Sequence, residues 1–152
     1  MEIGIAADHA GFEQKNLLLP LLTAAGYQVK DYGASVYNAD DDYPDAVLPL
    51  AQAISTGEIK RGIAICGSGV GVSVVANKLP GVRAALVTET YSAHQGVEHD
   101  DMNLLCLGGR VIGPSLIWDI IETYLKATYI GGGRFQRRLD KIIAIENKHI
   151  KP

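Results

Sequence analysis

Residues 63–73 read Ile-Ala-Ile-Cys-Gly-Ser-Gly-Val-Gly-Val-Ser, an apolar strand pattern that leads through a glycine loop into a helical pattern. This order is typical of an α/β fold, in which a buried strand ends beside the N-terminus of the next helix. Backbone N–H groups at such an N-terminus stabilise an anion, because the peptide dipoles are aligned toward it. Cys66 lies at the rim of this loop, where the same positive end favours the reactive thiolate. The stretch therefore predicts chemistry on an anionic small molecule.

Three known anion-binding loops differ from this one in spacing. The dinucleotide fingerprint Gly-x-Gly-x-x-Gly fails, because Val72 or Val74 stands where its third glycine is required. A nucleotide P-loop requires Gly-Lys-Ser/Thr, which the sequence lacks, and a cysteine phosphatase requires an arginine at position 72. One alternative stays open: the glycines form only a tight turn, and Cys66 is a small buried apolar side chain.

Length and composition indicate one domain over residues 1–152. The chain has 152 residues, of which 47% are hydrophobic, so it can bury a core of ordinary size. Its net charge of −3 argues against a nucleic-acid surface, and the apolar run at 17–22 is interrupted by Pro20, so no membrane span is expected. Cys66 and Cys106 lie in apolar runs and not in exposed loops, which favours a reduced, cytoplasmic protein.

Strand and helix patterns alternate along the chain. Such alternation implies right-handed βαβ crossovers, and therefore a parallel sheet covered by helices on both faces. We predict a three-layer α/β/α sandwich around a five-stranded parallel sheet. Residues 40–42, Asp-Asp-Asp, belong to the one irregular stretch and are typical of a solvated loop. The expected strands are 2–7, 27–32, 62–66, 82–87 and 104–108, and the expected helices are 11–25, 43–56, 70–78, 90–98, 114–128 and 134–148.

Polar residues follow the predicted strands where their carboxyl ends would meet at one edge of the sheet. Ligands of open α/β sheets bind outside this edge. Asp8 follows the first strand, and its simpler role would be to cap the first helix. The other candidates at this edge are Tyr43 after the second strand, Cys66, Gly67 and Ser68 after the third, and Arg110 after the fifth.

A histidine precedes the fifth predicted strand. An acid/base role suits His99 because imidazole titrates near neutral pH. His94, Asp100 and Asp101 would add metal-ligand chemistry, but adjacent residues at a bend rarely converge on one ion. We therefore predict no metal site.

A basic cluster opens the last predicted helix after three glycines. Arg134 and Arg138 are four residues apart, so they share one helix face and can clamp one phosphate. Arg137 points elsewhere, and an ordinary basic helix surface is the alternative interpretation of the whole cluster.

Short motifs occur in unbroken order from residue 2 to about residue 147. They are Asp8-His9-Ala10-Gly11, Tyr43-Pro44, Cys66-Gly67-Ser68-Gly69-Val70-Gly71, Ala76-Asn77-Lys78, Gly81-Val82-Arg83-Ala84, residues 99–103, Gly108-Gly109-Arg110 and residues 132–138. Together they resemble the type B ribose-5-phosphate isomerases, whose wider family includes allose-6-phosphate isomerase and the subunits of galactose-6-phosphate isomerase. The resemblance implies a Rossmann-like fold and a homodimer, in some members a tetramer, with sites shared between subunits. It implies no metal or organic cofactor, and a function in the pentose phosphate pathway.

The resemblance also implies a role for each candidate residue. Cys66 would be the base that moves a proton between C1 and C2 of an open-chain sugar phosphate through a cis-enediolate. Ser68 and His99 would help to open the furanose ring, with His99 supplied by the partner chain. Asp8 and Tyr43 would position the sugar, His9, Arg110, Arg134 and Arg138 would hold the phosphate, and the backbone N–H groups of Gly67, Gly69, Val70 and Gly71 would bind the developing oxyanion.

Two positions depart from the family pattern. Ser68 replaces a frequent threonine and keeps its hydroxyl, but Asp100 stands where asparagine is common. A carboxylate only accepts hydrogen bonds, so Asp100, a candidate substrate-binding residue, leaves the preferred sugar open. Allose 6-phosphate and galactose 6-phosphate are alternative substrates, and a non-catalytic sugar-phosphate binding module is an alternative function. Binding alone would require neither Cys66 nor His99, and a thiol-redox protein would require a nearby resolving cysteine.

Overall fold

The computed structural model describes residues 1–149, so the last three residues of the predicted domain lie outside the described part. All predicted elements are present, with ends within two residues of those expected. Among residues 1–149, no helix has the length and apolar composition that crossing a bilayer requires. The strands are β1 (Glu2–Ala7), β2 (Gln28–Asp31), β3 (Gly62–Cys66), β4 (Ala84–Leu86) and β5 (Leu104–Gly108), and the helices are α1 (Phe12–Ala24), α2 (Tyr43–Ser55), α3 (Val70–Ala76), α4 (Thr90–Asp100), α5 (Pro114–Lys126) and α6 (Gly133–His149).

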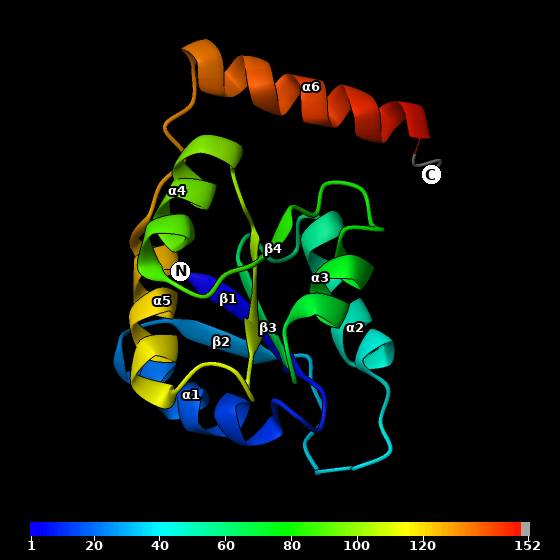
Figure 1. The fold of residues 1–152 in the computed structure, drawn as a ribbon, viewed down its shortest axis with the longest axis vertical. Coiled ribbons are helices and arrows are strands. Elements are labelled where there is room, and N and C mark those ends of the chain that lie inside the picture. The colour runs from blue at the N-terminus through cyan, green and yellow to red at the C-terminus, as the bar shows by residue number, and fades with distance from the viewer. Residues whose placement is uncertain (150–152) are drawn as a thin grey trace.

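The five strands form one parallel sheet in the order β2-β1-β3-β5-β4. The predicted five-stranded parallel sheet is thereby confirmed. After β1 the chain moves to β2 on one side, and it then crosses to β3 on the other side (Figure 1). The direction of winding thus reverses between β1 and β3. Ligands of open α/β sheets bind outside the carboxyl ends of the strands at such a reversal.

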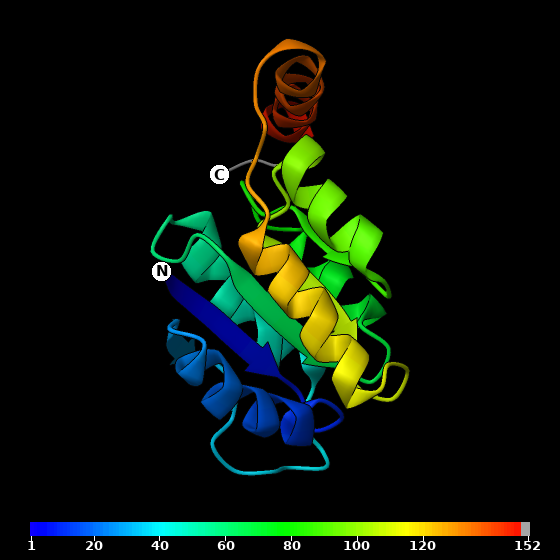
Figure 2. The same cartoon turned by 90° about the vertical axis from the view of Figure 1, so that its left-hand side faces the viewer.

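Side chains of the sheet enter two apolar layers, because successive residues of a strand point to opposite faces. On one face Ile63, Ile65 and Leu105 pack with residues of α1, α4 and α5, which lie in front of the sheet in Figure 2. On the other face Ala64 and Cys66 pack with residues of α2 and α3. Both faces are therefore covered, which confirms the three-layer α/β/α sandwich and explains the continuously apolar strands.

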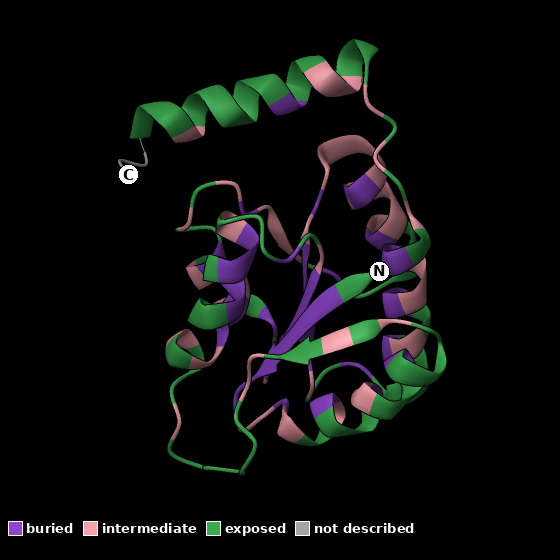
Figure 3. Ribbon diagram, turned by 180° about the vertical axis from the view of Figure 1, so that it is seen from behind, coloured by how far each residue is buried: buried purple, intermediate pink, exposed green. Residues whose placement is uncertain are grey.

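The last helix, α6, lies outside the sandwich, across the end of the sheet where the strands begin (Figure 1). Near its N-terminus Phe135 stacks on His99 of α4, and nearer its C-terminus Glu146 accepts the N–H of Gly81 at 2.8 Å. Leu139 is the single buried residue of this helix, and Figure 3 shows the rest of it largely exposed. Helix α6 is thus held by contacts near both of its ends and buries little of its surface.

Strand β4 is shorter than the predicted strand at 82–87, because side chains replace sheet hydrogen bonds around its start. Asn103 Oδ1 accepts the N–H of Arg83 at 2.7 Å, and Asn77 Oδ1 accepts the N–H of Ala84 at 2.9 Å. These polar side chains satisfy backbone donors that a longer strand would pair with a neighbour.

Candidate active site

The first cluster of predicted site residues lies where the winding of the sheet reverses. Ala7 pairs with Ile65, so the residues that follow β1 and β3 leave the sheet side by side. The N–H of Asp8 donates to the carbonyl of Ile65 at 3.2 Å, and one residue further along is Cys66. A pocket of about 480 Å³ opens here, lined by Asp8, Tyr43, Cys66, Gly67, Ser68, Gly71, Arg110 and Val111.

Cys66 is buried and lines this pocket, and its Sγ accepts the N–H of Gly69 at 3.1 Å. Gly69 has φ of +82°, and a Cβ there would lie 2.6 Å from Leu86 and 2.9 Å from the backbone of Leu107. Only glycine therefore allows the loop to turn its N–H toward the sulfur. The Gly69 N–H thus donates to the Cys66 sulfur in this structure, whereas the resemblance implied that it would bind the developing oxyanion.

The rest of the glycine loop forms one wall of the pocket. A Cβ at Gly71 would lie 2.7 Å from the ring of Tyr43, the first residue of α2, so the missing side chain lets this ring lie against the loop. Ser68 is exposed at the rim, and its Oγ accepts the N–H of Val70 at 3.3 Å. The hydroxyl of Ser68 and the phenol ring of Tyr43 thus line the same pocket as Cys66.

Asp8 is a buried carboxylate at the end of β1. Its Oδ1 accepts the N–H of Ala10 at 2.9 Å and that of Gly11 at 3.2 Å. Burial raises the pKa of Asp8, and these two N–H donors oppose the rise. Helix α1 takes Gly11 as its N-cap, without a side-chain cap, so the expected capping by Asp8 is replaced by support of the turn before the helix.

Two basic side chains, those of Arg110 and His9, lie on loops at this end of the sheet, and Arg110 lines the pocket. Arg110 follows β5, and its N–H donates to the carbonyl of Gly67 at 3.1 Å, which holds it beside the glycine loop. His9 lies next to Asp8, and its ring nitrogen Nδ1 is 2.7 Å from Asp41 Oδ1. Asp41 is half-buried in this contact, which corrects the prediction that the whole acidic run at 40–42 is solvated.

A second cluster lies at the far end of the molecule, where α4 ends and α6 begins. The His99 ring stacks on Phe135 with centroids 4.3 Å apart, and the guanidinium of Arg134 lies 4.9 Å from the centroid of the same ring. Gln95, one turn before His99, has its Nε2 2.9 Å from His99 Nδ1. An amide N–H that donates to Nδ1 leaves the imidazole proton on Nε2.

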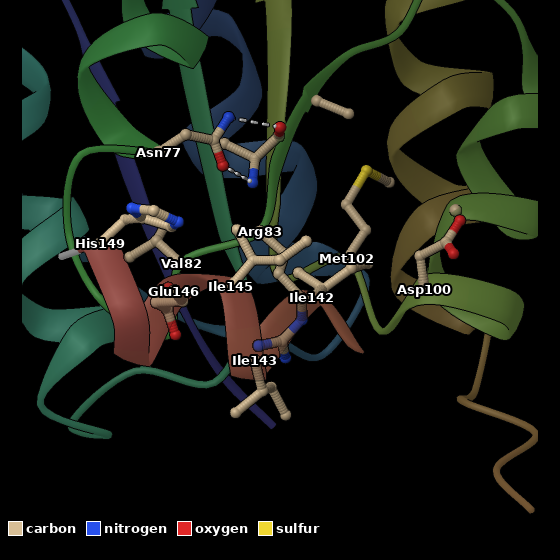
Figure 4. Close-up of a pocket in the computed structure, with 13 residues that line it drawn as sticks. Asn77, Val82, Arg83, Asp100, Met102, Ile142, Ile143, Ile145, Glu146 and His149 are labelled. Carbon is tan, nitrogen blue, oxygen red and sulfur yellow. Dashed lines mark hydrogen bonds between the residues drawn. The ribbon is translucent and has the colours of Figure 1, made fainter. Parts of the chain in front are cut away.

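Arg138 is one turn beyond Arg134 on α6, and both are exposed. Asp100, at the end of α4, lines a largely apolar groove of about 380 Å³ between α6 and the body of the protein (Figure 4). Ile142, Ile143 and Ile145 of α6 line the groove from the other side. The groove contains no residue of the Cys66 pocket, so Asp100 lies away from Cys66 within one chain.

Two groups of side chains offer atoms of the metal-ligand type. His94 Nδ1 lies 3.2 Å from Glu98 Oε2, so these residues pair with each other along α4. The polar atoms of Asp8, His9 and Asp41 lie within 4.8 Å of one another, an arrangement that their hydrogen bonds to protein N–H groups already explain. The absence of a metal site stays a prediction.

The predicted site residues therefore divide between the two ends of the molecule. Three residues that contact them were not predicted, namely Asp41, Gln95 and Phe135. Gln95 and His99 are four residues apart on one helix, so their spacing was a signal. Asp41 had no local signal, because 32 residues separate it from His9. The residues at the Cys66 end are Asp8, His9, Tyr43, Cys66, Gly67, Ser68, Gly69, Val70, Gly71 and Arg110, and those at the far end are His99, Asp100, Arg134 and Arg138.

A buried thiol and a glycine loop beside basic side chains, in the crevice where a parallel sheet reverses its winding, define an α/β enzyme of small anionic molecules. The sequence profile of the family described as Ribose/Galactose Isomerase matches residues 3–142. The chain belongs to that family, as its motifs predicted.

Three known proteins illustrate the similarity. A ribose-5-phosphate isomerase B of Clostridium thermocellum has 47% sequence identity, a TM-score of 0.93, and coverage of 98% of this chain and 99% of its own. Its counterpart from Mycoplasma genitalium, solved with bound ribulose-5-phosphate, has 40% identity, a TM-score of 0.92 and coverage of 97% of both chains. A D-erythrulose-4-phosphate isomerase of Pectobacterium atrosepticum is 41% identical and covers 88% of both chains.

Proposed function

We propose that the chain is an aldose–ketose isomerase that interconverts ribose 5-phosphate and ribulose 5-phosphate, with one catalytic domain over residues 1–152. The buried Cys66 thiol carries the proposal, because it accepts the N–H of Gly69 at 3.1 Å in a pocket that Arg110 also lines. Proton transfer next to a carbonyl requires a base and a site for the developing oxyanion. Membership of the ribose/galactose isomerase family supports the same reaction.

Cys66 is the proposed base, which moves a proton between C1 and C2 of the open-chain sugar through a cis-enediolate. The N–H of Gly69 donates to the sulfur that accepts this proton and so orients it in the pocket. The oxyanion is then assigned to the backbone N–H groups of Gly67 and Gly71 and to that of Val70, which would exchange its 3.3 Å contact with Ser68 Oγ for the oxyanion. A well-placed donor of this kind contributes roughly 3–4 kcal/mol to the transition state. Asp8 and Tyr43, which line the pocket, are the proposed contacts to the sugar.

Ring opening is assigned to Ser68 and to His99 of a second copy of the chain. Gln95 holds Nδ1 of His99, so Nε2 carries the proton and can donate it to the furanose ring oxygen. The stack on Phe135 keeps the imidazole plane in one orientation. The C1–O4 bond breaks as O4 gains this proton, and the C1 hydroxyl releases its own proton to solvent beside Ser68, so that C1 becomes the free aldehyde on which Cys66 acts.

The phosphate is assigned to four cationic side chains. His9 and Arg110 lie at the Cys66 end of one chain, whereas Arg134 and Arg138 lie at the far end on α6. One guanidinium group can donate two parallel hydrogen bonds to two oxygens of a phosphate. Two arginines one helical turn apart are therefore suited to bind a single phosphate. Because these two groups lie at opposite ends of the chain, one phosphate can contact both only across two chains.

A homodimer with two shared sites follows from this division. In a twofold-symmetric pair, the end of one chain that carries Cys66 meets the end of the other that carries His99, and the reverse contact forms at the same time. The groove in Figure 4 supports a second copy as the occupant, because its apolar wall of Ile142, Ile143 and Ile145 adjoins Asp100 at the far end. Exposed apolar groups beside a functional cluster are typical of such interfaces.

A cytoplasmic location is also part of the proposal. Cys66 and Cys106 are both free and buried, which is typical of proteins in reducing compartments. The proposed reaction draws its base, its oxyanion donors and its phosphate ligands from protein groups, so no metal or organic cofactor is assigned a role.

A substrate panel tests the proposed function. We expect the purified protein, assayed in the presence of EDTA, to interconvert ribose 5-phosphate and ribulose 5-phosphate with the highest kcat/KM of the panel. The panel includes allose 6-phosphate, galactose 6-phosphate and, because of the relative from Pectobacterium, D-erythrulose 4-phosphate. A higher kcat/KM for another sugar would identify that sugar as the preferred substrate. Binding without turnover of any sugar would contradict the proposed enzymatic activity.

A further inference from the structure

The acidic run at 40–42 contains one residue, Asp41, whose side chain is half-buried. A single oxygen of Asp41, Oδ1, accepts the backbone N–H of His9 at 3.0 Å and lies 2.7 Å from Nδ1 of the His9 ring. Its neighbours Asp40 and Asp42 are exposed, whereas the Asp41 side chain is 20% exposed and that of His9 is 27% exposed. Asp41 therefore fixes both the backbone and the ring of one residue of the candidate site.

This double contact determines how the His9 ring is oriented and where its protons lie. A carboxylate only accepts hydrogen bonds, so Nδ1 must carry a proton toward Asp41, and Nε2 is left as the ring edge for a ligand. Three charged groups face His9: Asp41 from the loop after β2, Asp8 from the end of β1, and Arg110 after β5. The hydrogen bond from Asp41 raises the pKa of His9, and Arg110 opposes the rise.

We propose that Asp41 is a positioning residue that holds His9 as an oriented imidazolium for the phosphate group of the substrate. The inference rests on the proposed function, which assigns the phosphate to His9 and Arg110. Two cations side by side repel each other in the free enzyme, and a carboxylate on the opposite edge of one ring offsets this repulsion. Asp41 thereby keeps a second positive charge available for a phosphate dianion.

The test compares Asp41→Asn with Asp40→Asn, a control that removes the same charge one residue away from an exposed side chain. The first measurement follows the His9 ring by NMR titration, with its signals assigned from a His9→Gln variant. We expect Asp41→Asn to lower the pKa of His9 and Asp40→Asn to leave it unchanged. Asp41→Glu, which keeps the carboxylate, should restore part of the rise and gives a second variant if Asp41→Asn folds poorly.

The second measurement is the KM for ribose 5-phosphate as a function of pH, in EDTA. We expect Asp41→Asn to raise KM about tenfold, the size of one charge-assisted hydrogen bond, with kcat within about twofold of wild type. The increase should be largest between the two pKa values of His9 and should shrink below both, where the ring is charged in either protein. The ionisation of the phosphate cancels in this comparison, because the substrate is the same.

The outcomes separate this inference from the proposed function. An unchanged titration of His9 in Asp41→Asn, or an equal rise in KM for Asp40→Asn, would overturn the role of Asp41. If the protein turns over no sugar, a titration with inorganic phosphate still decides: the His9 signals should shift on binding, with weaker affinity in Asp41→Asn than in Asp40→Asn. Equal affinities in those two variants would also overturn the inference.

Discussion

Cys66 and Cys106 lie on neighbouring strands and belong to the same apolar layer, yet their surroundings differ. Cys106 is inside β5, where burial raises the pKa of its thiol and favours the inert protonated form. Cys66 ends β3, so its sulfur meets the glycine loop and accepts the N–H of Gly69. Two positions of register, from the inside of one strand to the end of its neighbour, therefore separate a packing cysteine from a candidate base.

Replacement of the two cysteines tests this difference. We expect Cys66→Ala to lower kcat for ribose 5-phosphate by roughly two to four orders of magnitude, because a positioned base acts on the transition state. KM should stay within about tenfold of wild type. The matched control is Cys106→Ala, which should keep kcat within about twofold while lowering thermal stability. Near-normal turnover by Cys66→Ala would remove Cys66 from the mechanism.

Asp100 is the residue at which local chemistry and family pattern disagree. If it contacts the sugar from a partner chain, Asp100→Asn removes a charge near the enediolate and supplies a hydrogen-bond donor. We expect the ratio of kcat/KM between ribose 5-phosphate and the other sugars of the panel to change about tenfold, as for one mispaired buried polar contact. An equal change for all sugars would place Asp100 at the common enediolate, and no change would place it outside the site.

Contacts between side chains were the least predictable part of the site. The residue types in the Cys66 loop were sufficient to predict an anion-binding loop beside a thiol. The loop is rich in glycine because its backbone must turn tightly. The direction of the Gly69 N–H depends on its φ of +82°, which the sequence does not specify. The contact of Asp41 with His9 depends on the path of a whole loop, which has no repeating pattern from which to predict it.

At the scale of elements, the sequence pattern of α6 predicts where the helix begins and ends but not where it packs. Its bounds were predicted within one residue at each end, because the three glycines before Arg134 mark its start. Its position was not predicted, because Leu139 is its single buried residue and leaves little pattern to orient it. Specific contacts place it instead, namely the stack of Phe135 on His99 and the Glu146 bond to Gly81.

The arginines of α6 can be separated by substitution one at a time. We expect Arg134→Ala and Arg138→Ala each to raise KM for phosphorylated sugars by about tenfold to a hundredfold, the range of a charge-assisted hydrogen bond. Arg137→Ala removes the same charge from another face of the helix and should change KM less than twofold. A lower melting temperature with unchanged KM in the first two variants would identify a structural helix terminus instead of a phosphate clamp.

At the scale of the molecule, the alternation of strands and helices was sufficient to predict the sheet and its layers. Parallel strands require crossovers, and each crossover leaves a helix on one face, so local patterns already fix this architecture. The separation of the candidate residues between two ends of the molecule could not be predicted from such local patterns. His99 lies at the end of α4, which runs back along the sheet to the edge where the strands begin, so it lies far from Cys66.

Mixing two inactive variants tests whether two chains form each site. In a heterodimer of Cys66→Ala and His99→Ala, one site lacks both groups and the other has both. Random pairing at equal concentrations makes half of the dimers mixed, so about a quarter of all sites are intact. We therefore expect the mixture, refolded or co-expressed to allow exchange of subunits, to recover up to about a quarter of wild-type activity, measured with ribose 5-phosphate.

The matched control pairs two variants from the same end of the chain, Cys66→Ala and Asp8→Asn. Every site in that mixture lacks one of the two groups, because both come from the same subunit, so it should stay as inactive as its components. Recovery in the first mixture alone would show that the Cys66 end and the His99 end meet across subunits. Equal failure of both mixtures, with mixed dimers confirmed by differently tagged chains, would contradict the shared site and require His99 to act elsewhere.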